Sequence, residues 1–81
     1  MLTKYTVILV AVTEPMLVAR ITVLLRKYDV HLNSLQRDTL PQGQEQLTLT
    51  VENQRDNMAV AMSKLERLVP VVSLQYQPVK P

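Results

Sequence analysis

The chain has 81 residues, a length typical of one domain, with 47% apolar residues and a net charge of +2. It has no cysteine and one histidine, His31, so disulfides, thiolate metal sites and multi-histidine metal sites are excluded. The nine Lys and Arg residues are scattered, and Phe and Trp are absent, which argues against a nucleic-acid surface. No apolar run reaches the roughly 20 residues of a membrane span, and no signal-peptide pattern is evident, so we expect a cytoplasmic protein.

Residues 3–12 form the first predicted strand, in which both alternating sets of side chains are apolar, as in a central strand covered on both faces. A helix is expected to begin at Thr13-Glu14-Pro15 and to run to about Tyr28, where Asp29 ends it. Thr13 can cap the helix, Glu14 suits the positive end of its dipole, and Pro15 is tolerated in the first turn. The apolar stripe of this helix consists of Leu17, Ile21, Leu24, Leu25 and Tyr28.

The second predicted strand covers residues 30–38. Its apolar phase shifts at Ser34-Leu35, which indicates a bulge or a strongly twisted edge. Residues 39–44 form a hairpin loop that contains the only glycine, Gly43.

Residues 45–52 alternate strictly between apolar and polar, which predicts a strand with one buried face. Asn53 is the expected cap of a second helix that extends to about Val69 and is stopped by Pro70. Its stripe comprises Met58, Ala61, Met62, Leu65, Leu68 and Val69, and the two methionines are interpreted as core rather than as a binding groove. Residues 71–77 form the last strand, with Val72, Leu74 and Tyr76 facing inward, and residues 78–81 form a tail.

The order β-α-β-β-α-β, with right-handed crossovers and a central hairpin, predicts an α+β ferredoxin-like fold. We expect one domain over residues 1–81, with a folded core at 4–77 and a four-stranded antiparallel sheet in the order 4-1-3-2. Both helices cover one face, so the second strand lies at an edge and invites pairing with another chain. The first strand is apolar on both faces, so its uncovered face is expected to need a partner.

Catalytic residues are not predicted. A nucleophilic triad would have to use His31 with Ser34 or Ser73, and no nucleophile turn surrounds them, so His31 is interpreted as a surface or interface residue. The carboxylates lie mostly at element ends or on solvent faces. The turn after the first strand presents helix N–H groups that suit the carboxylate of a small ligand, although Glu14 brings negative charge there, so capping and ligand binding both remain open.

Three segments carry a resemblance to a known family. Residues 20–35 look like a first helix leading into a strand that ends in Ile-Glu-Ser-Leu, residues 47–52 look like the third strand, and residues 64–74 look like a Lys-Leu-Val-Asp-Val segment. In order and spacing, over about residues 4–77, they resemble the ACT domain family. Within it the chain is most similar to the small regulatory subunits of acetolactate synthase, in particular those of isozyme II.

The resemblance implies a non-catalytic subunit of branched-chain amino acid biosynthesis that dimerises, binds the large catalytic subunit and raises its activity. The large subunit would hold thiamine diphosphate, Mg²⁺ and FAD, with no cofactor or metal in this chain. The implied dimer edge consists of His31, Asn33, Leu35 and Arg37.

In valine-sensitive members of the family, an effector lies between two ACT domains, held by an Asn-x-x-Gly turn and by the neighbour's second strand. Thr13 and Met16 occupy the corresponding turn positions here, and Met16 brings bulk where glycine permits close approach, so the chain is expected to be insensitive to valine. The candidate effector set is Thr13, Glu14, Met16, Leu17, Asn33 and Ser34. Two alternatives remain open: a stand-alone ACT module that senses an amino acid, and a small ferredoxin-like enzyme.

Overall fold

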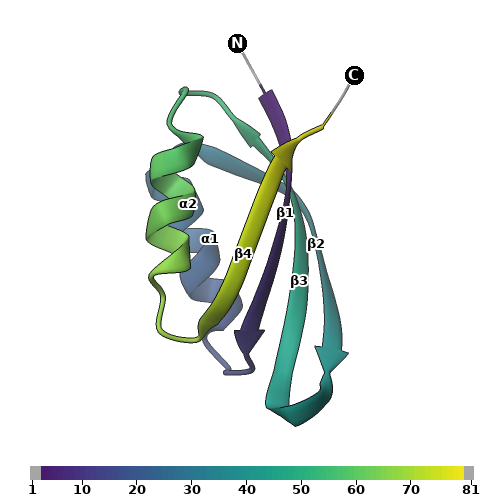
Figure 1. The fold of residues 1–81 in the computed structure, drawn as a ribbon. Coiled ribbons are helices and arrows are strands. Elements are labelled where there is room, and N and C mark those ends of the chain that lie inside the picture. The colour runs from purple at the N-terminus through teal and green to yellow at the C-terminus, as the bar shows by residue number, and fades with distance from the viewer. Residues whose placement is uncertain (1–2, 80–81) are drawn as a thin grey trace.

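Four strands and two helices follow one another in the order β-α-β-β-α-β in the computed structural model, which describes residues 3–79 (Figure 1). The elements are β1 (Thr3–Val12), α1 (Leu17–Lys27), β2 (Val30–Leu40), a short 3-10 turn η1 (Pro41–Gly43), β3 (Gln44–Asn53), α2 (Met58–Glu66) and β4 (Val71–Pro78). Neither helix in this range is long and apolar enough to cross a membrane.

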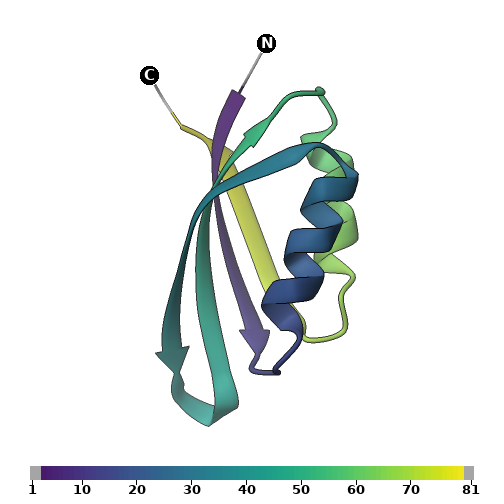
Figure 2. The ribbon, with the colours of Figure 1, turned by 180° about the vertical axis from the view of Figure 1, so that it is seen from behind.

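The strands form one antiparallel sheet in the order β2-β3-β1-β4, which confirms the predicted α+β ferredoxin-like topology. Figures 1 and 2 show both helices on the same face of the sheet. No element of residues 3–79 covers the opposite face of the sheet, and β2 and β4 are the two edge strands.

The hydrophobic core lies between the helices and the sheet. Every second residue of β1 and β3 points into it, as strand periodicity requires, and the helices contribute residues at three- and four-residue spacing. The buried core residues of these four elements are Val7, Leu9, Ala11, Leu17, Ile21, Leu25, Leu47, Leu49, Val51, Met58, Ala61, Met62 and Leu65. Met58 and Met62 are therefore core residues, as the sequence indicated.

Helix α1 begins one turn later than predicted. The backbone N–H of Thr13 donates to the carbonyl of Gly43 at 2.9 Å, so the chain is still tied to the hairpin loop at this point. Helical geometry starts only after Met16, and within residues 3–79 no side chain caps this end. Asp29 follows the helix with a φ of 57°, a left-handed conformation that Asp tolerates better than most residues, and this confirms the predicted end.

Helix α2 is shorter than predicted at both ends. Asn53 ends β3 rather than starting the helix, and it positions Asn57, the residue before the first helical turn, through two hydrogen bonds. The helix ends at Glu66, and Val69, which was predicted to belong to its apolar stripe, is 91% exposed. A short turn closed by the N–H of Val71 on the carbonyl of Leu68 directs Val69 outward.

The strand pairing contains two register shifts. The first, between Leu32 and Ser34 in β2, confirms the bulge expected near Ser34-Leu35. The second lies beside Val10 and Ala11, where an extra residue in β4 places Val71 opposite Ala11. Val72 is therefore 57% exposed and not inward as predicted, whereas Leu74 packs against the core.

Candidate functional site

The turn between β1 and α1 is fixed by backbone contacts. Besides the bond from Thr13 to Gly43, the N–H of Leu17 donates to the carbonyl of Glu14 at 3.3 Å. The Glu14 carboxylate lies 3.7 Å from the Arg20 guanidinium, which partly offsets its negative charge at the start of α1. Thr13 is exposed and does not act as the helix cap that was predicted.

Met16 and Leu17, both candidate effector residues, lie in different environments. The Leu17 side chain is fully buried in the core, so it does not face a ligand at the turn. Met16 is 60% exposed and helps to line a groove of about 530 Å³ on the outer surface of the helices. Arg20, Lys27 and Lys64 also line this groove.

The second group of candidate residues lies on the edge strand β2. His31, Asn33, Ser34 and Arg37 are exposed, and Leu35 is half-buried against the core. The Asn33 amide donates to the Glu52 carboxylate at 3.0 Å, so this side chain is already engaged within its own chain.

A single chain does not bring the two groups together. Ser34 is opposite Thr50, which pairs with Thr6 near the start of β1, whereas the turn follows Val12 at the end of β1. Six residues of strand separate these positions, or about 20 Å at roughly 3.4 Å per residue. Any site that combines them would therefore need the β2 of a second chain.

An ion pair that the sequence analysis missed joins Arg37 of the second group to Glu45 at the start of β3. Glu45 is only 3% exposed, and its carboxylate accepts two hydrogen bonds from Arg37, Nε to Oε1 at 2.7 Å and Nη2 to Oε2 at 3.1 Å. The signal was available, because Glu45 shares its strand face with Leu47, Leu49 and Val51, all of them buried. Arg37 was predicted as a dimer-edge residue and is exposed, but it also neutralises this buried acid.

The pairing raises the pKa of Arg37, first through its hydrogen bond to Glu45 and then through the charge of that carboxylate. Because the folded-state pKa lies above the unfolded one, the stabilisation is fully present below the unfolded-state pKa of arginine. It is lost only as the pH rises through the raised folded-state value. The guanidinium side of the pair is therefore insensitive to pH in the neutral range.

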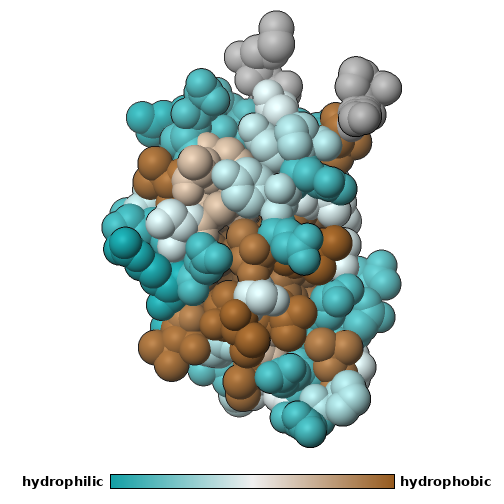
Figure 3. Space-filling view, viewed as in Figure 1, coloured by the Kyte–Doolittle hydropathy of each residue, from teal (hydrophilic) through white to brown (hydrophobic). Residues whose placement is uncertain are grey.

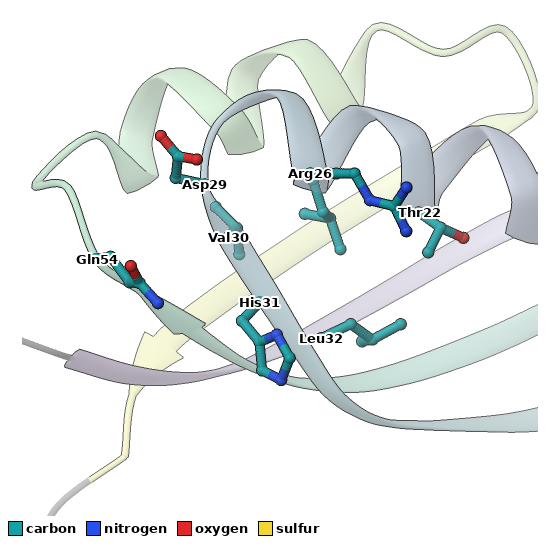
Figure 4. Close-up of a pocket in the computed structure, with 8 residues that line it drawn as sticks. Thr22, Arg26, Asp29, Val30, His31, Leu32 and Gln54 are labelled. Carbon is teal, nitrogen blue, oxygen red and sulfur yellow. The ribbon is translucent and has the colours of Figure 1, made fainter.

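A cleft of about 370 Å³ lies between the second half of α1 and the start of β2 (Figure 4). Its lining residues are Thr22, Leu25, Arg26, Asp29, Val30, His31, Leu32 and Gln54. Arg26 comes from the last turn of α1, Asp29 from the turn that follows the helix, and His31 from the start of β2 (Figure 4). Asp29 is also held by Arg55 at 3.0 Å. No sequence pattern predicts this cleft, since it depends on how α1 lies against β2.

No protein-family model and no curated protein matches the sequence. Among solved structures, the ACT domain from GTP pyrophosphokinase of Chlorobium tepidum superposes with a TM-score of 0.77 and 15% identity, covering 95% of this chain and 100% of that one. An ACT domain protein from Streptococcus pneumoniae gives a TM-score of 0.74 at 11% identity, with 94% and 89% covered. The fold is that of an ACT domain.

A larger protein contains the same arrangement. Homoserine dehydrogenase from Thiobacillus denitrificans has a TM-score of 0.83 at 21% identity over 99% of this chain. The chain spans only 18% of that dehydrogenase, so the likeness concerns one part of a longer protein. At these identities the similarity establishes the ACT fold, and function has to be argued from the residues themselves.

Proposed function

We propose that this ACT-fold chain is a non-catalytic regulatory subunit that binds and activates the large catalytic subunit of acetolactate synthase, in the biosynthesis of isoleucine, valine and leucine. The proposal rests on the three segments that resemble such subunits. In the structure they lie, in order, from α1 into β2, within β3, and from the end of α2 into β4. The sequence likeness and the ACT fold therefore support the same alignment along the chain.

The observation that best supports a binding role is that the helices cover only one face of the sheet. Both helices cover one face, while Ile8, Val10 and Val12 of the central strand point to the other, and Val12 is 49% exposed. A partner that covered these side chains would remove apolar surface from water.

In this proposal thiamine diphosphate, Mg²⁺ and FAD belong to the large subunit, and this chain acts by binding. Activation is then a shift of population: the chain binds the active arrangement of the large subunit more tightly than the inactive one. The size of the effect is limited by that difference in affinity.

The proposal is tested by adding the purified chain to the isolated large subunit and measuring acetolactate formation. We expect the rate to rise with added chain and then to saturate. A rate that stays at the level of the large subunit alone would rule out an activating role.

One observation favours amino-acid sensing as a second candidate. The cleft between α1 and β2 is lined by Arg26, whose guanidinium suits the carboxylate of a free amino acid, and by Asp29, which would have to exchange its contact with Arg55 for the ammonium group. If the chain is such a sensor, calorimetry with the branched-chain amino acids detects binding that Arg26→Gln abolishes. Heats equal to those of dilution would remove this candidate.

Dimerisation through the β2 edge, at His31, Asn33, Leu35 and Arg37, stays a prediction. The separation of the turn from Asn33 and Ser34 supports it only if an effector site exists, because such a site would need two chains. The other edge of the sheet offers a competing surface.

A further inference from the structure

The groove beside Met16 lies on the outer surface of the two helices, which are side by side on the sheet (Figures 1 and 2). Its volume is about 530 Å³. Side chains at three- and four-residue spacing form its α1 wall, among them Met16, Ala19, Val23 and Lys27. Because residues at this spacing share one face of a helix, the groove follows a single face of α1. Lys64 and Leu68, at and just beyond the end of α2, form the other wall.

The apolar part of the groove is open to solvent. Val23 is 70% exposed and Met16 is 60% exposed, while Leu24 and Leu68 are half-buried. Single exposed apolar residues are common on protein surfaces, but here four of them line the same groove. A partner that filled the groove would remove this apolar surface from water.

All charged residues that line the groove are basic. They are Arg20, Lys27 and Lys64, and no carboxylate is among the lining residues. Arg20 lies 3.7 Å from the Glu14 carboxylate. Neither Lys27 nor Lys64 forms an ion pair with a carboxylate of residues 3–79. The groove therefore offers two ammonium groups to a negatively charged partner.

The length of the groove favours an extended occupant over a compact one. Its α1 wall extends from Met16 to Tyr28, which corresponds to about 18 Å at roughly 1.5 Å per residue. A ligand of the size of an amino acid would contact only part of this length. About three turns of a helix match it, and apolar side chains at i, i+3, i+4 and i+7 would follow the groove.

A second hydrophobic surface lies around the lower half of β4 (Figure 3). Val69 is 91% exposed and Val72 is 57% exposed at the start of this strand. No charged residue occurs between Arg67 and Lys80, so this segment supplies no charge that would select a partner. The groove on the helices combines apolar side chains with charges of one sign, and so it specifies the chemistry of its occupant.

We propose that the groove docks an acidic amphipathic helix of another protein. The apolar stripe of that helix lies on Val23 and Leu68, and its carboxylates lie beside Lys27 and Lys64. A second copy of this chain is a poor occupant, because two such grooves would bring the same cations face to face. The inference holds for whichever protein supplies the helix, so it does not rest on the proposed function.

The first test uses two designed peptides of about 15 residues, each with a fluorescent label and leucines at i, i+3, i+4 and i+7. Glutamates flank the leucines in one peptide, and lysines occupy the same positions in the other. We expect the anisotropy of the glutamate peptide to rise and saturate as the chain is added, and that of the lysine peptide to stay at its free value. Equal binding of both peptides, or no binding of the glutamate peptide, would overturn the proposal.

Four variants locate the binding site. Lys64→Glu should weaken binding of the glutamate peptide about fivefold, and Val23→Asn about tenfold, through the lost ion pair and the lost apolar contact. Arg67→Glu and Val60→Asn are the matched controls, because both residues are exposed but do not line the groove. Charges outside the contact are screened at physiological salt, so the affinity of the controls should stay within about twofold. Controls that lose as much affinity as the groove variants would show that the peptide binds elsewhere.

A further measurement does not depend on how any variant folds. In NMR spectra of the unaltered chain, the glutamate peptide should shift mainly the amide signals of residues 16–28 and 64–68. Shifts concentrated in β2 or β4 would contradict the proposal. An anionic lipid surface is the other occupant that the charges permit. Cosedimentation with phosphatidylserine vesicles that Lys64→Glu abolishes, without binding of the glutamate peptide, would replace the helix by a membrane and overturn the proposal.

Discussion

The buried Glu45 carboxylate depends on Arg37 for its two hydrogen bonds. Removing Arg37 leaves the Glu45 carboxylate buried with neither of its two hydrogen bonds, whereas removing Arg55 leaves Asp29, which is half-exposed and remains hydrated. Arg37→Ala should therefore lower the urea midpoint of unfolding clearly more than Arg55→Ala. Glu45→Gln added to Arg37→Ala should recover part of the loss. Equal losses for the two arginine variants would show that the buried acid does not need its partner.

Met16 tests the interpretation of the β1–α1 turn. If its side chain blocks the close approach that glycine permits, valine should give no binding heat in calorimetry with the unaltered chain. Binding of valine at micromolar affinity would contradict the proposed insensitivity. Met16→Gly is the variant to compare with the unaltered chain in the same calorimetry, because it removes the side chain without touching the core.

At the scale of elements, α1 has one face in the core and one in solvent. Leu25 is 1% exposed and Val23 is 70% exposed, only two residues away. Leu25→Ala should lower the free energy of unfolding by about 3 kcal/mol, from lost burial and the cavity left behind, and Val23→Ala by less than about 0.5 kcal/mol. Urea denaturation of the two variants measures the difference. Comparable losses would mean that α1 packs on a different face.

The strands were predictable because burial imposes a period of two on them, which β3 follows over its whole length and β1 from Val7 to Ala11. Helix starts were less predictable, because they depend on contacts distant in the sequence. The bond from Thr13 to Gly43 delays α1, and Asn57, held by Asn53 and by the Tyr28 carbonyl, begins α2 four residues after the expected cap. The exposure of Val72 was also not predictable, since nothing in the local sequence pattern marks the extra residue in β4.

At the scale of the whole molecule, the topology follows from a few rules applied to six elements. A short hairpin between β2 and β3 and two crossovers leave few ways to arrange the sheet, and the predicted order was confirmed. The candidate site was not predictable in the same way. Its two groups lie at opposite ends of one sheet, and the cleft beside His31 depends on the packing of α1 against β2.

The central claim is that this chain works by binding another polypeptide, and sedimentation with the isolated large subunit of acetolactate synthase tests it most directly. With the chain in excess, we expect a single faster boundary that contains both proteins and a constant ratio of chain to large subunit at saturation. Two boundaries at the positions of the separate proteins, at every ratio tried, would contradict the account.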